Sequence, residues 1–177
     1  MTFLELCQKV SSEAGVSTTG PTSVRNQVGI LAKIVSWVAE ADLAIQGEHV
    51  RWKFLWDSAT FNFAANQQEY TPGHFNMANA DVIETEQIDS VSCQGIPLHK
   101  FSWDRYKDEV RHASVPLSSA FPQVCTVQPN GKIMVAPVPS SNFPGEVDFY
   151  KTPVKMLENI DSSAIPNKYH LIIVHKA

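Results

Sequence analysis

The sequence has few charged residues and no long apolar run, and both absences narrow the class of protein. Asp, Glu, Lys and Arg make up 18% of the 177 residues, the net charge is −4, and no basic run occurs. General adhesion to nucleic acid or to a membrane surface therefore gains no support. No stretch approaches about 18 consecutive apolar residues, so a transmembrane helix is not expected. The 44% hydrophobic content indicates a globular chain of one domain, or of one domain with an insertion.

Residues capable of catalysis or metal binding are present but are not arranged for either. The three cysteines, Cys7, Cys93 and Cys125, form no CxxC pair, so we expect reduced structural thiols. The histidines lie at neither HxxxH nor HxH spacing, so we interpret all six as surface residues. They are His49, His74, His99, His112, His170 and His175.

Acidic residues cluster in one stretch without forming a known ion-binding loop. The cluster lacks the glycine turn and the twelfth-position glutamate of a calcium loop. Its members are Asp81, Glu84, Glu86 and Asp89. No GxSxG, GxGxxG or GxxxxGK[ST] motif occurs either. We therefore predict no catalytic residues, no metal site and no cofactor.

The longest proline-free stretch, about 24–46, predicts a long helix that begins after a cap at Thr22 or Ser23. Its apolar arc is roughly 200° wide, although a surface helix needs an apolar stripe of only about 100°. Either the rest of the chain or another subunit must therefore cover the second part of the arc. We predict that the first part is intramolecular core, and that the second is a subunit interface. The predicted core residues are Val28, Leu31, Val35 and Val38; the candidate interface residues are Ile30, Ile34, Trp37 and Ala41.

Two shorter helices are predicted near the ends of the chain. Thr2 and Glu5 form a T-x-x-E capping box for a helix over residues 2–14. A terminal helix restarts at Ile165-Pro166, where proline suits the first helical position. Because that helix shows no stop signal at Ala177, we expect the natural polypeptide to continue.

Between the helices the sequence changes to the period-2 alternation of strands. Strands are predicted over 51–56, over the stretch 59–70 that contains Phe61 and Phe63, and over 87–92, 96–101, 123–127, 132–136 and 146–152. Gln94-Gly95 and Asn130-Gly131 mark hairpins, and residues 102–110 predict a short capped helix. Aromatic residues alternate with Arg51 and Lys53, which places rings and cations on opposite faces. That pattern favours a core-facing strand over a ligand platform; the predicted core rings are Trp52, Phe54, Trp56, Phe61 and Phe63.

The predicted fold class is α+β, with a helical bundle of a short, a long and a C-terminal helix and a large antiparallel β-rich insertion. The predicted domains are residues 1–48 plus 164–177 for the bundle and 49–163 for the insertion.

Three segments resemble the head-to-tail adaptor (connector) proteins of tailed phages. Residues 1–24 are similar to an N-terminal L-x-x-E-x-G helix followed by a G-P turn. Residues 28–56 resemble the family's second helix and its W-x-W/F-L entry into the β region. Residues 165–177, IPNKYHLIIVHKA, are similar to the start of the family's terminal helix. The layout is also similar to that of the tail tubular protein A group of podophages, but His49, Val50 and Arg51 depart from a frequent D-W pair.

The resemblance implies a structural, non-enzymatic protein of the virion neck, made in the host cytoplasm. It implies a ring of twelve copies that joins the portal protein to tail, nozzle or tail-tube proteins around the DNA channel. Double-stranded DNA would pass through without sequence-specific contacts, and no membrane is involved. An alternative is a binding module whose aromatic β region contacts a glycan or a tail fibre.

Overall fold

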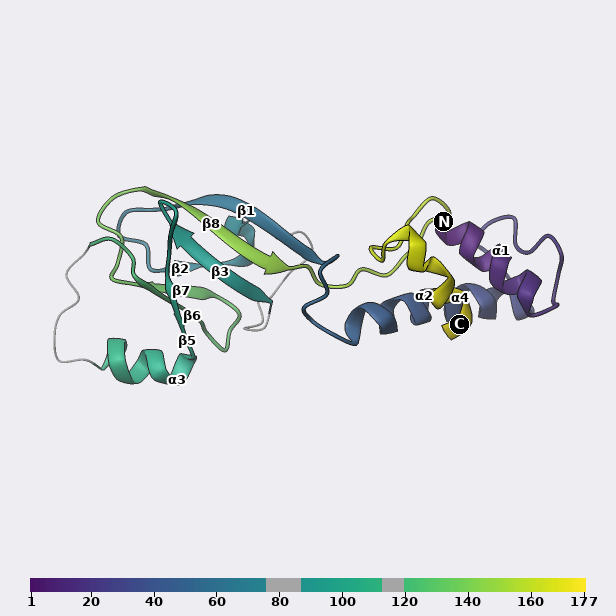
Figure 1. Cartoon of the computed structure of the whole chain (residues 1–177), viewed down its shortest axis with the longest axis horizontal. Helices are drawn as coiled ribbons and strands as arrows, with labels where there is room; N and C mark the ends of the chain where they lie inside the picture. The colour runs from purple at the N-terminus through teal and green to yellow at the C-terminus, as the bar shows by residue number, and fades with distance from the viewer. Residues whose placement is uncertain (76–86, 113–119) are drawn as a thin grey trace. The chain divides into compact units, whose positions relative to one another are not determined.

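The structure is a computed structural model that describes residues 1–75, 87–112 and 120–177. It divides into two compact units. Unit 1 comprises Met1–Leu55 and Pro153–Ala177, and unit 2 comprises Trp56–Thr152. The predicted fold class is confirmed, since a β-rich segment is inserted between helices (Figure 1). Compactness does not test independent folding, so the predicted domain bounds stay a prediction.

Unit 1 is a bundle of three α-helices that contact one another: α1 (Phe3–Glu13), α2 (Gly29–Gly47) and α4 (His170–Lys176). A 3-10 turn, η3 (Asn167–Tyr169), leads into α4. All three helices contribute side chains to one hydrophobic core, which includes Leu6, Val38 and Ile173. In this part of the chain, as in the other described residues, no helix is long and apolar enough to cross a bilayer.

The N-terminal capping box forms as the sequence predicts. Glu5 donates its backbone N–H to Thr2 Oγ1 at 3.3 Å, and the Thr2 N–H donates to Glu5 Oε2 at 2.9 Å. Two otherwise unpaired N–H groups of the first turn are thereby satisfied. Phe3, Leu6 and Val10 are buried on the face that this register selects.

The long helix begins later than predicted, at Gly29 instead of about Val24. Asn26 and Gly29 have φ values of 57° and 62°, which a continuous right-handed helix cannot contain. Ser23 does not cap the helix: its hydroxyl and the Val24 N–H both donate to Asn159 Oδ1. Val28 is the N-cap residue and supplies no side-chain cap. The segment before the helix is therefore held by a loop about 130 residues away in sequence, which local periodicity cannot reveal.

Unit 2 contains two four-stranded sheets. The first has the order β1-β8-β3-β4 and is antiparallel throughout; the second has the order β2-β7-β6-β5 and contains one parallel pair, β5 with β6. The strand bounds are β1 Trp56–Phe63, β2 Glu69–Tyr70, β3 Ile88–Cys93, β4 Ile96–Pro97, β5 His99–Phe101, β6 Val124–Val127, β7 Ile133–Ala136 and β8 Phe143–Tyr150. Both sheets line one core, to which Phe63, Val147, Tyr70 and Val135 contribute.

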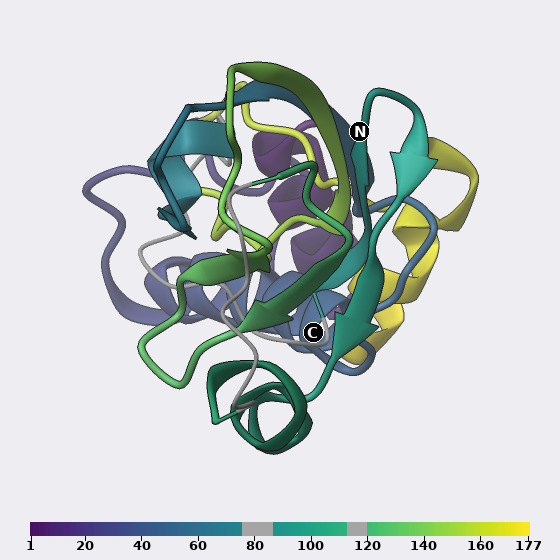
Figure 2. The same ribbon diagram turned by 90° about the vertical axis from the view of Figure 1, so that its left-hand side faces the viewer.

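Short helical segments complete unit 2. A 3-10 turn, η1 (Pro72–Phe75), follows β2, and α3 (Trp103–Tyr106) continues into a π-type turn, η2 (Lys107–Arg111). The Ser102 hydroxyl caps α3 by accepting from the Arg105 N–H. The helix contacts β6 and is seen nearly along its axis in Figure 2. The predicted capped helix is thus present, but its second half has the wider π-type turn in place of the α-helical turn.

The strand predicted over residues 51–56 is wrong, because only Trp56 of this stretch belongs to a strand. Trp52 instead donates its indole N–H to the Ile45 carbonyl at 3.0 Å, in the last turn of α2. Its ring stacks on Phe54 with 5.3 Å between centroids. Alternating aromatic residues fit this turn as well as a strand, and in the turn the Ile45 carbonyl accepts the indole N–H in addition to the Glu48 N–H.

The predicted core residues differ in how far the structure buries them. Val38 and Phe63 are fully buried, whereas Leu31, Val35, Phe54 and Phe61 are half-buried against the two cores. Trp52 is also half-buried. Val28 is 82% exposed because it precedes the helix, and Trp56 is 48% exposed because it lies on the outer face of β1. Both were expected in the core, and both expectations are wrong.

Candidate interaction surface

The outer side of α2 carries apolar side chains that the rest of the chain leaves exposed. Ile30 and Trp37 are two turns apart on one side of the helix, with 44% and 43% of their surfaces exposed. Lys33 lies between them and Glu40 lies one turn beyond Trp37 on the same side, and both are exposed. The two large apolar side chains of this strip, Ile30 and Trp37, are therefore available for contact with another protein.

Only two of the four candidate interface residues belong to this strip. Ile34 is fully buried and Ala41 is 6% exposed, and both belong to the core of unit 1. The prediction that these two face a neighbouring copy is therefore corrected. Because α1 and α4 both pack on α2, the bundle covers a wider arc than a single neighbouring helix would.

A polar network is buried on the inner side of α2. Asp42 is fully buried and accepts hydrogen bonds from the Gln46 amide at 2.7 Å and the Ser163 hydroxyl at 2.5 Å. Burial raises the pKa of the Asp42 carboxyl above its usual value, although the hydrogen bonds from Ser163 and Gln46 oppose that rise. Ser163 also accepts from the Ile165 N–H, so the network fastens the C-terminal segment to the long helix.

His170 belongs to this buried region, so its assignment as a surface histidine is wrong. Its side chain has no exposed area, and Nε2 lies 2.7 Å from the Ile165 carbonyl oxygen. Since a carbonyl only accepts, Nε2 carries the proton and donates it there. Nδ1 lies 3.0 Å from the amino group of Met1 and accepts from it. His170 therefore ties the N-terminus to the start of α4.

A hydrogen-bonded loop in unit 1 presents the most exposed isoleucine of the described residues. Ile160 is 83% exposed and Leu157 is 65% exposed. The Asp161 carboxylate accepts from the Leu157 and Glu158 N–H groups at 2.7 and 2.8 Å. Asn159 joins the loop to Val24, and Glu158 pairs with Arg25. These bonds tie the loop to itself and to the segment before α2, and its apolar side chains remain exposed.

Helix α4 adds a third apolar area. Leu171 and Ile172 are 48% and 51% exposed, whereas the next two residues, Ile173 and Val174, are buried in the core of unit 1. The helix thus has an inner apolar side that its own bundle covers and an outer apolar side that it does not. Its apolar surface is wider than one bundle requires.

The exposed apolar surface is concentrated in unit 1. Of the fourteen large hydrophobic residues exposed among the described residues, twelve lie in unit 1. They are Val16, Val28, Ile30, Trp37, Leu43, Val50, Val154, Leu157, Ile160, Tyr169, Leu171 and Ile172. Unit 1 has eight Lys and Arg against seven Asp and Glu, whereas unit 2 has six against eleven. A nearly neutral, apolar surface favours binding to protein over binding to DNA.

Sequence reasoning missed the loop and the outer side of α4 as candidate contacts. In the loop, Val154, Leu157 and Ile160 recur every three residues, which was the available signal. That signal is weak because the stretch forms no regular element, so its hydrophobic residues cannot be assigned to an inner or outer face. In α4 the run Leu171–Val174 is apolar throughout, and only tertiary contacts separate its two sides.

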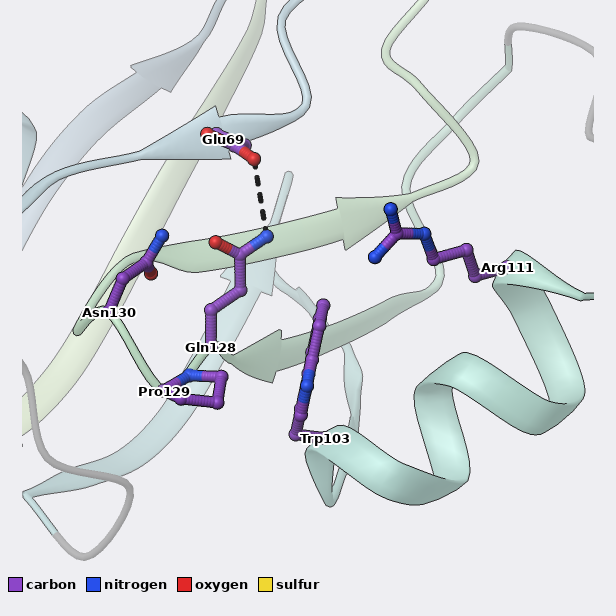
Figure 3. Close-up of a pocket in the computed structure, with 6 residues that line it drawn as sticks. All are labelled: Glu69, Trp103, Arg111, Gln128, Pro129 and Asn130. Carbon is purple, nitrogen blue, oxygen red and sulfur yellow. Dashed lines mark hydrogen bonds between the residues drawn. The ribbon is translucent and has the colours of Figure 1, made fainter.

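Unit 2 contains an open pocket of about 380 Å³ (Figure 3). Trp103 forms one wall, and Arg111 projects from η2 beside it. Glu69 accepts a hydrogen bond from Gln128 at 3.2 Å and pairs with Lys132 at 3.1 Å. The Lys132 hydrogen bond is the main reason why the pKa of Glu69 is lowered. Pro129 and Asn130 complete the lining, which holds no nucleophile with a neighbouring base and so favours no reaction.

The remaining reactive groups are buried or dispersed. Cys7, Cys93 and Cys125 are free and buried, and burial raises the pKa values of their thiols to about 12, 11 and 12. In the described part of the chain, His, Cys, Asp and Glu form no group of three that could hold a metal ion. Asp81, Glu84 and Glu86 of the acidic cluster lie outside the described residues.

A family model described as SU10 adaptor protein matches residues 1–177. The chain belongs to the SU10 adaptor protein family. No curated protein matches it. The match spans the whole sequence, so it includes both the apolar bundle and the β-rich insertion.

Membership confirms the resemblance to phage head-to-tail adaptors that the three sequence segments indicated. SU10 adaptor proteins are structural phage proteins, so this chain is a virion component that associates with other virion proteins. An adaptor must bury surface against its neighbours, and the exposed apolar residues of unit 1 are surface of the kind that such contacts bury.

Proposed function

We propose that this SU10 adaptor protein forms a ring in the virion neck, joining the portal protein to the tail around the DNA channel. The observation that carries the proposal is the concentration of exposed apolar side chains on unit 1. Leu157 and Ile160, for example, are both exposed on one hydrogen-bonded loop. Burying such residues against another protein would be favourable by about 25 cal/mol for each Å² of apolar surface.

A closed ring needs two different, complementary surfaces on each copy, because its contacts are head-to-tail. Unit 1 offers three apolar areas, on α2, on the loop that contains Ile160 and on α4. Two of them would join neighbouring copies, which leaves one for the portal. We propose a ring of twelve copies on the basis of the resemblance to head-to-tail adaptors. Each interface would bury about 800 Å² or more on each partner.

The two units would bind different partners of the adaptor. We propose that the helical bundle makes the contacts between copies and with the portal, and that the β-rich insertion contacts tail, nozzle or tail-tube proteins. Double-stranded DNA would pass through the ring without base-specific contacts. The near balance of charge in unit 1 and the acidic excess of unit 2 give neither unit the large positive net charge that favours tight binding to DNA.

Trp37→Glu tests the α2 part of this surface. Trp37 is 43% exposed, so the substitution should leave the monomer folded while placing a charge in the proposed interface. Ring formation, followed by native mass spectrometry and negative-stain microscopy, should be lost. Trp56→Glu is the matched control, because Trp56 is exposed to a similar extent but lies in unit 2. Rings that persist with Trp37→Glu would remove α2 from the interface.

A further inference from the structure

The outer edge of β1 has backbone groups that no other strand uses. β1 lies at the end of its sheet and pairs only with β8. On β8, the Tyr150 N–H donates to Gln87 and the Pro144 carbonyl accepts from Gln94, so even-numbered residues of β8 point toward β3. Odd-numbered residues of β8 therefore bond to β1. In the register of this pair, the odd-numbered residues of β8 lie opposite Asp57, Ala59, Phe61 and Phe63 and form hydrogen bonds with them. The backbone groups of the alternate residues, Ser58, Thr60 and Asn62, therefore point away from β8.

Part of this edge is blocked, and part is open. At its first end, the Ser58 N–H donates to the side chain of Asp57 at 2.9 Å. Farther along, the backbone N–H and C=O groups of Thr60 and Asn62 have no partner in the described part of the chain. Residues 58–63 contain no Lys and no Pro, and the pairing of β1 with β8 has no bulge. Three devices that commonly protect a long edge strand, namely Lys, Pro and a bulge, are therefore missing from residues 58–63.

The opposite edge of the same sheet is protected. β4 has only two residues, and one of them is Pro97, which has no N–H to donate. One edge of this sheet is therefore protected and the other, at β1, is open, so an open edge is not a general property of the unit. An unprotected edge of this length is a template for an added strand.

The two faces next to this edge differ in chemistry. On the inner face, Ala59 and the half-buried Phe61 border the core of unit 2, so an added strand would place apolar side chains there. On the outer face, Thr60 is directly opposite Glu146, and Ser58 is opposite Asp148. Glu146 is exposed and has no ion pair among the described residues. Basic side chains on an added strand would reach these carboxylates across the small Ser58 and Thr60.

We propose that β1 accepts an extended, basic segment of a partner protein as an additional strand of this sheet. The segment places apolar residues on the side of Phe61 and Lys or Arg on the side of Glu146 and Asp148. Its backbone pairs with Thr60 and Asn62. The acidic excess of unit 2 attracts such a segment over distances of about 10 Å. The site is formed by residues of unit 2, so its test does not depend on ring formation.

The test uses the full chain and a blocked peptide of about nine residues in which valine alternates with lysine and threonine. Binding should shift the NMR signals of the Thr60 and Asn62 amides and slow their hydrogen exchange. Thr60→Pro removes one outward N–H and leaves the bonds to β8 intact, so it should weaken binding at least about tenfold. Thr60→Ala is the matched control and should bind as the wild type does. Glu146→Gln should weaken binding several-fold, and the effect should shrink as salt is added.

A second probe keeps the test informative if Thr60→Pro does not fold. The same peptide, N-methylated along its pairing edge, keeps its side chains and loses its donors, so it should not bind. Equal binding by both peptides would overturn the proposal. So would Thr60 and Asn62 amides that are already protected from exchange in the free protein. A dimer of the chain that Thr60→Pro dissociates would also overturn it, since the occupant would then be a second copy.

Discussion

Gly145→Ala should destabilise unit 2 through a steric conflict that the structure locates. Gly145 lies on β8 opposite Phe61, and the rings of Phe61 and Phe63 cover its backbone. A Cβ atom at this position would lie 2.7 Å from Phe63 Cε2 and 2.8 Å from Phe61 Cζ, both well inside van der Waals contact. Phe63 is fully buried and cannot move away freely. We expect a loss of about 1–3 kcal/mol in the free energy of unfolding.

Urea denaturation followed by circular dichroism would measure this loss, and hydrogen exchange at Val147 would assign it to unit 2. Tm should fall by roughly 4–20 °C. Phe61→Leu in the same background removes two of the three ring atoms nearest to the new methyl group, so the double variant should lose less stability than the two single variants combined. A loss below about 0.5 kcal/mol, additive with that of Phe61→Leu, would refute the proposed conflict.

Three further predictions concern unit 1 and the thiols. Thr2→Ala removes the capping hydroxyl of α1 and should cost about 1 kcal/mol in chemical denaturation; an unchanged midpoint would contradict the cap's role. Asp42→Ala leaves Ser163 and Gln46 without their acceptor and should cost about 1–3 kcal/mol, more than Asp42→Asn does. Because burial raises the pKa of Asp42 in the folded state, its protonation favours folding: that contribution is present below pH 3.8 and is lost as pH rises through the raised pKa. Asp42→Asn should therefore remove this part of the pH dependence of unfolding, and a curve that keeps it would assign it to another group. Cys7, Cys93 and Cys125 should resist alkylation at neutral pH until the chain unfolds, since their thiol pKa values are raised to about 12, 11 and 12; rapid labelling of the folded protein, measured by mass spectrometry, would contradict this.

Local signals predicted the elements whose causes are local. The Thr2–Glu5 capping box depends on residues three apart, and it forms as expected. The Gln94-Gly95 hairpin is equally local, since both residues adopt the positive φ values that such a turn requires. In each case the residues that specify the structure are neighbours in the sequence, so their pattern is sufficient.

Features set by distant contacts were predicted less well. The start of α2 depends on Asn159, which holds Val24 outside the helix. The burial of Ile34 and Ala41 depends on helices at both ends of the chain, so periodicity identified an apolar arc but not the part of it that stays exposed. His170 is buried because the N-terminus and the Ile165 carbonyl supply its partners. None of these partners is marked in the sequence around the residue concerned.

The central claim is that the apolar surface of unit 1 holds this adaptor in a ring against the portal. Negative-stain microscopy of the purified protein with its portal, using wild type and Trp37→Glu in parallel, tests it most directly. For the wild type, we expect annular particles about as wide as the portal. For Trp37→Glu, we expect unassembled protein with an unchanged circular dichroism spectrum. Wild-type protein that remains monomeric beside intact portal rings would contradict it.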